Sequence, residues 1–159
     1  MSEYIIGIDP DAGEKGHGVA VYRSGELVNL KNLTLLELQG FLFDGVDSKY
    51  SNVEIHMEDN VMVSAAYRAQ AKQGSLAVKL KMAQHIGMLK QAQIELERMF
   101  YACGIKLVKR KPASQWKKGT DDFKRATGWT GRSNEDTRSA AYFGYLGVRD
   151  SKLIKREAK

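Results

Sequence analysis

A short apolar run that stops at a carboxylate and a proline constrains this chain more than any other feature. Residues 4–9 read YIIGID and are followed at once by Pro10, which has no backbone N–H to continue a sheet ladder. The run is therefore predicted to be a buried strand that ends at Asp9. A glycine-rich turn follows, and residues 18–22 and 26–30 are predicted as two further strands. Three strands joined by short turns predict an antiparallel meander.

The chain then returns to the sheet through a helix. Thr34 and Glu37 have the spacing of a capping box, which predicts a helix from there to about residue 43. Residues 53–58 (VEIHME) alternate with period two and end in Glu58, which predicts a fourth strand. Because this strand is reached through a helix, it is expected to lie parallel to the first. The polar segment that follows is predicted to be irregular and carries Tyr67, Arg68 and Lys72.

The second half is predicted to be mainly helical. Ser75 is the expected cap of a long helix that runs to about residue 101 and has two apolar stripes. A helix that is apolar on two sides usually packs on two sides, here predicted to be the sheet and a second copy of the chain. The remaining predicted elements are a strand at 105–108, a short helix plus loop within 112–130, and a last helix from 133 to about 146. Residues 1–150 are expected to form one domain, followed by a basic tail over 151–159.

The charge of the chain is uneven. The formal net charge is +6, and between residues 106 and 138 ten cations face only four acids. Such a local excess favours a polyanionic partner such as DNA, although a solvated basic face without a partner is the alternative. The glycine-rich turn lacks the Walker lysine pattern, so no nucleotide cofactor is expected.

Cysteine and hydropathy patterns exclude several classes of protein. The single cysteine excludes a disulfide framework and a multi-cysteine zinc site. No apolar run approaches the roughly 20 residues that span a bilayer, and the N-terminus has no signal-peptide pattern. A cytoplasmic protein without membrane contact is therefore expected.

Three acids are placed where a metal-dependent reaction needs them. Asp9 and Glu58 end two strands predicted to be parallel, and Asp136 lies in the first turn of the last helix. Ligands gather at the C-terminal ends of parallel strands, and clustered carboxylates suit Mg²⁺ or Mn²⁺. Two such ions roughly 3.5–4 Å apart can activate a water and stabilise the leaving oxygen of a phosphodiester. The ordinary alternatives are a turn-forming Asp9 and an Asp136 that complements the helix dipole.

Five segments carry a resemblance to a known family. They are residues 5–22 (IIGIDPDAGEKGHGVAVY), 53–60 (VEIHMEDN), 75–89 (SLAVKLKMAQHIGML), 106–118 (KLVKRKPASQWKK) and 134–145 (NEDTRSAAYFGY). In this order they resemble the RuvC family of Holliday junction resolvases, in the RNase H-like superfamily. The resemblance implies an α/β fold with a five-stranded mixed sheet of order 3-2-1-4-5 and helices on both faces. It also implies a homodimer that cuts two strands of a four-way DNA junction with Mg²⁺.

The resemblance assigns roles to individual residues. Asp9, Glu58 and Asp136 fall at the family's acidic positions. Lys117 or Lys118 falls near a basic residue beside the scissile phosphate, where a cation stabilises developing charge. The predicted DNA contacts are Lys109, Arg110 and Lys111, together with Tyr67, Arg68 and Lys72.

Two positions depart from the family's pattern. Ser133 stands where the family usually has an acid or a histidine, and it is predicted to cap the last helix instead. Val61 stands where bacterial members have an aromatic wedge, and the nearest loop aromatic is Tyr67. Glu135 either supplies the missing metal ligand or complements the helix dipole. The departures indicate a divergent member, of phage or mobile-element type. An RNase H-type nuclease acting on RNA–DNA hybrids stays open, because the same arrangement of carboxylates serves both enzymes. Ser133 leaves open a DNA-junction-binding protein with a degraded active site.

Overall fold

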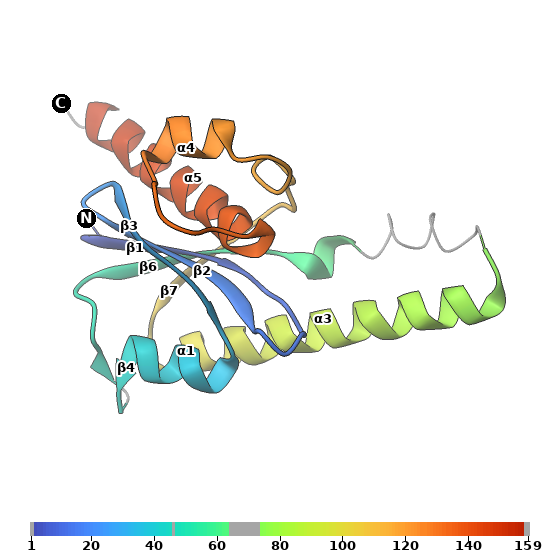
Figure 1. Ribbon diagram of the computed structural model, residues 1–159. Helices are drawn as coiled ribbons and strands as arrows, with labels where there is room; N and C mark the ends of the chain where they lie inside the picture. The colour runs from blue at the N-terminus through green and yellow to red at the C-terminus, as the bar shows by residue number, and fades with distance from the viewer. Residues whose placement is uncertain (1, 46, 64–73, 158–159) are drawn as a thin grey trace.

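Five strands form one mixed sheet, in the order β3-β2-β1-β6-β7, in the computed structural model of the chain (Figure 1). β1 pairs antiparallel with β2, and β2 with β3, whereas β6 lies parallel to both β1 and β7. This is the order implied by the resemblance to the RNase H-like superfamily, with β6 and β7 as the predicted fourth and fifth strands, so the predicted fold class is confirmed. The structure describes residues 2–45, 47–63 and 74–157. Its elements are β1 (Tyr4–Asp9), β2 (His17–Arg23), β3 (Glu26–Leu33), α1 (Leu35–Leu42), β4 (Phe43–Asp44), β5 (Asp47–Ser48), β6 (Val53–Glu58), η1 (Asn60–Val63), α3 (Leu76–Ala102), β7 (Lys106–Arg110), α4 (Asp121–Thr127) and α5 (Glu135–Glu157).

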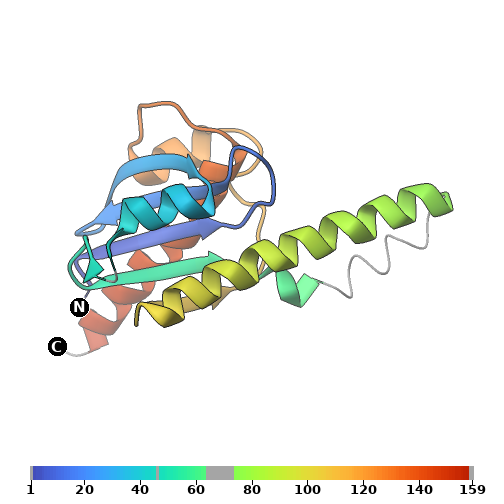
Figure 2. The same ribbon diagram turned by 90° about the horizontal axis from the view of Figure 1, so that it is seen from below.

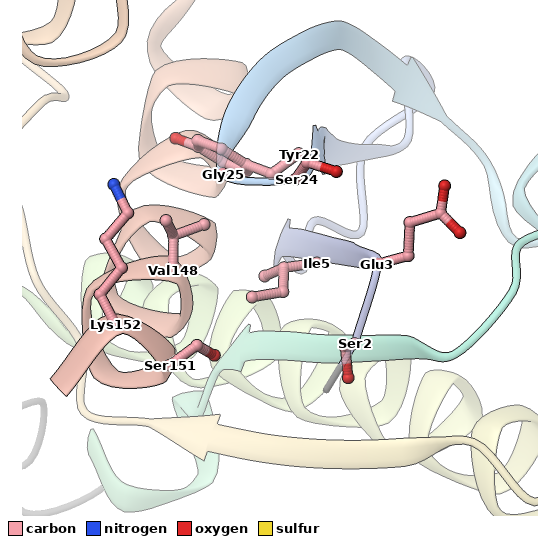
Figure 3. A pocket seen from close by; sticks show the side chains of 9 residues that line it. All are labelled: Ser2, Glu3, Ile5, Tyr22, Ser24, Gly25, Val148, Ser151 and Lys152. Carbon is pink, nitrogen blue, oxygen red and sulfur yellow. The ribbon is translucent and has the colours of Figure 1, made fainter. Parts of the chain in front are cut away.

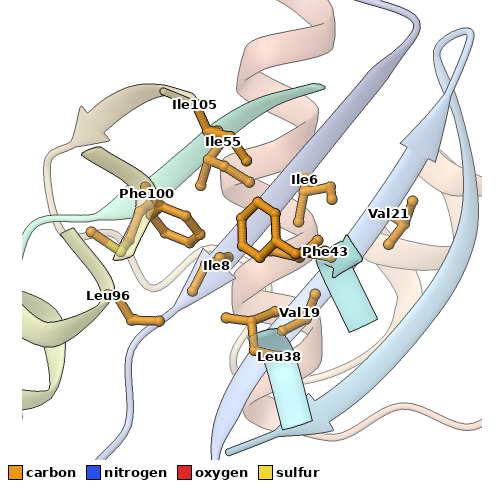
Figure 4. Packing of buried hydrophobic residues seen from close by; sticks show 12 residues of the cluster. Ile6, Ile8, Val19, Val21, Leu38, Phe43, Ile55, Leu96, Phe100 and Ile105 are labelled. Carbon is orange, nitrogen blue, oxygen red and sulfur yellow. The ribbon is translucent and has the colours of Figure 1, made fainter. Parts of the chain in front are cut away.

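Helices cover both faces of the sheet, with α1 and α3 on one side and α4 and α5 on the other (Figure 1). On the α1/α3 side, Ile6 and Ile55 from the strands pack with Leu38 and Phe100 from the helices (Figure 4). On the α4/α5 side, Ile5 and alanines of α5 form a second buried cluster. Because both faces are buried, the first strand is apolar on both sides and shows no alternation.

Helices α1 and α3 begin where the sequence predicts, whereas α5 does not end where it predicts. Thr34 begins α1 with both hydrogen bonds of a capping box, and the Ser75 side chain caps α3, as predicted. The predicted end of the last helix near residue 146 was wrong, because α5 continues through most of the expected tail, to Glu157. Gly147 does not end the helix. A Cβ at that position would lie 2.5 Å from the His56 ring, so the missing side chain makes room for the histidine.

Helix α5 lies directly against the backbone of β1 and β2. A Cβ on Gly7 would lie 1.9 Å from the Ala140 carbonyl oxygen, and one on Gly18 would lie 2.3 Å from the Asp136 carbonyl oxygen. Only glycine allows so close an approach at these two positions. Since Gly18 pairs with Asp9 in the sheet, this contact brings the start of α5 next to the end of β1.

Only the C-terminal part of α3 packs on the sheet. Leu96 and Phe100 are fully buried, whereas Leu76 and Leu80 are 71% and 62% exposed. Figure 2 shows why, because the N-terminal half of α3 extends well past the edge of the sheet. Among the helices that the structure describes, none is long and apolar enough to cross a membrane.

Candidate active site

Asp9 and Glu58 lie side by side at the C-terminal ends of the parallel strands β1 and β6. Both are almost fully buried, with 6% and 4% of their surface exposed. Burial raises the pKa of Asp9 to about 8, helped by the negative charge of Glu58 and by the hydrogen bond between the two side chains. Asp9 therefore holds a proton near neutral pH unless a cation replaces it.

Among the described residues, Lys117 is the cation that forms ion pairs with both acids. Its Nζ lies 4.0 Å from Asp9 Oδ2 and 3.9 Å from Glu58 Oε1. Burial of the ammonium disfavours its charge, but the surrounding carboxylates outweigh that effect and raise its pKa. Those carboxylates are Asp9, Glu58, Glu135 and Asp136. All four acids predicted as metal ligands thus lie within the electrostatic reach of one lysine.

The segment that carries Lys117 is fixed by hydrophobic packing and by one arginine. Trp116 is buried and makes aromatic contacts with Phe123 and with two tyrosines of α5. Arg138 donates from Nε to the Trp116 carbonyl (3.0 Å) and from Nη2 to the Lys117 carbonyl (2.8 Å). The sequence left Lys117 and Lys118 as equal candidates. The structure places Lys117 in the acidic cavity and Lys118 at an exposed position.

Asp136 enters the same cavity from the first turn of α5 (Glu135–Glu157). The cavity has a volume of about 450 Å³ and is lined by Asp9, Glu58 and Lys117 as well as Asp136. The predicted cap Ser133 was wrong. Asn134 Oδ1 accepts the Thr137 N–H at 2.9 Å, and Thr137 Oγ1 accepts the Asn134 N–H at 2.9 Å. Asparagine is at least as good an N-cap as serine, and this reciprocal pair satisfies two backbone donors.

Four side chains at or around the site were not found from the sequence. Lys15, from the β1–β2 loop, lies 2.7 Å from the Asp136 carboxylate, and His85 of α3 lines the cavity. The buried Ser139 hydroxyl lies beside Asp9 at a geometry short of a regular hydrogen bond, and it favours the charged carboxylate. Ser139 could have been found, because it follows Asp136 by three residues and so shares its helix face.

Gln93 is the fourth of these side chains, and it fixes the turn that follows Glu58. It is fully buried in α3, where its Nε2 donates to Asp59 Oδ1 (2.9 Å) and its Oε1 accepts the Asn60 N–H (2.6 Å). The sequence does contain a clue to Gln93, because it is a polar residue within an apolar stripe of α3 that continues to Leu96 and Phe100.

The predicted DNA contacts have different surroundings. Lys109 forms an ion pair with Glu97 at 3.3 Å and remains 43% exposed, and Lys111 is exposed. Arg110 is committed within the chain, since it donates to Asp150 at 2.6 Å and to His56 Nδ1 at 3.1 Å. The other three predicted contacts, Tyr67, Arg68 and Lys72, lie outside the described residues.

The chemistry of the donor set fits a divalent metal ion. Two adjacent buried carboxylates offer the hard oxygen ligands that Mg²⁺ and Mn²⁺ prefer, and an ion would replace the proton on Asp9. Within residues 2–45, 47–63 and 74–157, however, no three His, Cys, Asp or Glu side chains are already grouped as a metal site. Asp9 and Glu58 are therefore the core of the candidate site. Asp136 lines the same cavity but is paired with Lys15.

A second cavity, of about 280 Å³, lies at the opposite end of β1 (Figure 3). It is lined by Ile5, Tyr22 and Val148, with Glu3 and Lys152 at its border. It contains a single acid and so lacks the clustered carboxylates of the first cavity. We assign the candidate chemistry to the cavity that holds Asp9.

Fold and site together define an α/β domain of RNase H-like topology with paired carboxylates at the ends of its central parallel strands. No family model and no curated protein matches the chain. Among solved structures, the chain is similar to Thermus thermophilus RuvC in complex with a Holliday junction substrate, at 11% sequence identity and a TM-score of 0.41. The similarity covers 92% of this chain and 97% of that one. A similarity this low says nothing about function, so the function has to be inferred from the residues of the site.

Proposed function

We propose that this protein is a metal-dependent endonuclease that resolves four-way DNA junctions by paired phosphodiester hydrolysis. The observation that carries the proposal is the pair of buried carboxylates, Asp9 and Glu58, at adjacent parallel strand ends with Lys117 within 4.0 Å of both. Burying two acids beside each other costs stability unless a cation is bound, and such a cost is typical of functional sites. The substrate class comes from the resemblance of the sequence to the RuvC family.

In this proposal the carboxylates hold one or two Mg²⁺ ions, which Mn²⁺ can replace. Asp9 and Glu58 would ligate from the strands, and Asp136, with or without Glu135, from α5. When bound, such an ion activates a water and stabilises the leaving oxygen of the phosphodiester. Lys117, held by Arg138, would place its ammonium next to the scissile phosphate and stabilise the developing charge. Lys109 and Lys111 would contact phosphates further along the backbone.

The proposal includes a homodimer through α3. The residues Leu76, Leu80, Ala83 and Gly87 of the second predicted stripe are all exposed in the single chain. A symmetric junction with two cleavage points suits a protein with two-fold symmetry. Light scattering at micromolar concentration should show twice the chain mass of 17.8 kDa. A replacement of Leu76 and Leu80 by glutamate should return it to one chain. A wild-type monomer, with junction bound, would contradict the dimer.

One experiment tests the activity. The protein is incubated with a four-way junction, a linear duplex and an RNA–DNA hybrid, each with Mg²⁺ or EDTA. Paired nicks in the junction alone support the proposal, whereas cleavage of the hybrid selects an RNase H-type nuclease. Asp9→Asn serves as the matched control, because it should lose cleavage and keep junction binding. Cleavage by purified Asp9→Asn would remove Asp9 from the active site.

A second function has one observation in its favour. The ion pair between Lys15 and Asp136, at 2.7 Å, occupies an acid that a nuclease of this kind would use for its metal. A junction-binding protein without cleavage activity would tolerate this pair permanently. Junction binding without cuts in Mg²⁺ or Mn²⁺ would select that function.

A further inference from the structure

Lys15 forms an ion pair with the Asp136 carboxylate. It lies in the loop between β1 and β2, which is shaped by its own hydrogen bonds, from the Asp11 N–H to His17 Nδ1 (3.0 Å) and from the Gly16 N–H to the Gly13 carbonyl (3.1 Å). Its Nζ lies 2.7 Å from Asp136 Oδ2. This hydrogen bond and the charge of Asp136 raise the pKa of Lys15, so the ammonium is fully charged at neutral pH.

The two lysines of the site differ in how firmly they are held. Lys117 is 27% exposed, and Arg138 binds its backbone carbonyl. The Lys15 side chain is 54% exposed and reaches Asp136 from a loop. An exposed ion pair of this kind is weak, with a typical strength of at most about fivefold in an equilibrium constant. Lys15 can therefore exchange one anionic partner for another at little cost.

A divalent ion and an ammonium repel each other strongly at the distance of a shared carboxylate. A metal ion that binds Asp136 Oδ2 therefore has to displace Lys15, whose ammonium contacts that oxygen at 2.7 Å. Lys117 lies further from its acids, at 3.9 and 4.0 Å, and can stay in place. The released ammonium is then free near Asp136, which lines the cavity where, in the proposed function, a DNA phosphate arrives. Phosphate is a good alternative partner, because charge-assisted hydrogen bonds to it are as strong as those to a carboxylate.

We propose that the Lys15 ammonium stays paired with the Asp136 carboxylate until a DNA phosphate binds that ammonium instead, so that DNA and the metal ion bind cooperatively. This inference rests on the proposed function and adds to it a positioning residue that regulates the third acid. Lys15 thereby disfavours a fully loaded metal site in the absence of DNA. By linkage, DNA must raise the affinity for the metal by the same factor as the metal raises the affinity for DNA.

The test measures binding of Mn²⁺ to the full chain, from the electron paramagnetic resonance signal of the free ion, and needs no turnover. Without DNA, Lys15→Met should bind Mn²⁺ about two- to fivefold more tightly than wild type, the range expected for an exposed ion pair. Lys15→Arg should retain the wild-type affinity. Lys124→Met is the control, because it removes the same charge from an exposed position on α4. It should bind Mn²⁺ like wild type.

The second arm adds a four-way junction and subtracts the Mn²⁺ bound by the junction alone. DNA should tighten Mn²⁺ binding more in wild type than in Lys15→Met. Equal Mn²⁺ affinities of wild type and Lys15→Met, in a protein that binds the ion and cuts junctions, would overturn the inference and leave the proposed function intact. If wild type neither binds Mn²⁺ nor cuts junctions, both the proposed function and the role of Lys15 are contradicted.

Discussion

The contact between Gly18 and Asp136 makes a strong prediction about the geometry of the site. In Gly18→Ala the new Cβ would lie 2.3 Å from the Asp136 carbonyl oxygen, whereas ordinary van der Waals contact begins at 3.4 Å. Because the clashing atom belongs to the backbone, the start of α5 must retreat by about 1.1 Å, the difference between these two distances. Overpacking of this kind costs about 1–3 kcal/mol of stability. A displacement of about 1 Å in a catalytic group can slow a reaction roughly 100-fold.

The assay is single-turnover cleavage of a four-way junction, together with urea unfolding of the same samples. Gly40→Ala is the matched control, because a Cβ there meets nothing within 4 Å. Gly40 lies on the exposed side of α1, so alanine should stabilise that helix by up to about 1 kcal/mol and leave cleavage unchanged. If Gly18→Ala folds with wild-type stability and cuts at the wild-type rate, the close approach of α5 does not position Asp136, and the reasoning is refuted.

Three further predictions concern the acids and the residues that support them. In EDTA, Asp9→Asn should raise the free energy of unfolding measured by urea titration, by an amount that grows from pH 3.8 to about 8 and then levels off. The reason is that folded wild type keeps a proton on Asp9 that the unfolded chain releases over this interval. A stabilisation that does not depend on pH would contradict the raised pKa. Gln93→Leu should cost about 1–3 kcal/mol in urea unfolding, because it removes one donor from the buried Asp59 carboxylate and the acceptor of the Asn60 N–H. An unchanged midpoint would show that these two hydrogen bonds are dispensable. Glu135→Gln should raise the Mg²⁺ concentration for half-maximal cleavage; if that midpoint stays constant while Asp136→Asn destroys activity, Glu135 only complements the helix dipole.

The sequence predicted the parts of the fold that have local signals. The meander, the strand that ends in Glu58, the capping box at Thr34 and the cap at Ser75 were found because each depends on spacing over a few residues. The hairpin of β4 and β5 was missed, since two-residue strands are too short to show a period. The end of the last helix was missed because the His56 ring that packs on Gly147 belongs to a distant strand.

The candidate site could be predicted only where strand ends reveal it. Asp9 and Glu58 were identified because parallel strands bring their C-terminal ends together. The choice of Lys117 over Lys118 needed the buried Trp116, which fixes the direction of its neighbour. The partnership of Lys15 with Asp136 joins a loop to a helix far along the chain, and no local pattern contains such a pair.

One turn of α5 delivers three parts of the site at once. Asp136 provides the carboxylate, Arg138 holds the loop that carries Lys117, and Ser139 faces Asp9. Transient opening of this turn would therefore withdraw an acid, a lysine and a hydroxyl in the same event, while the sheet stays folded. We expect the site to switch between assembled and dismantled as one cooperative unit, without half-built states. Hydrogen exchange of the amides at the start of α5 would then report the fraction of molecules that are ready to react.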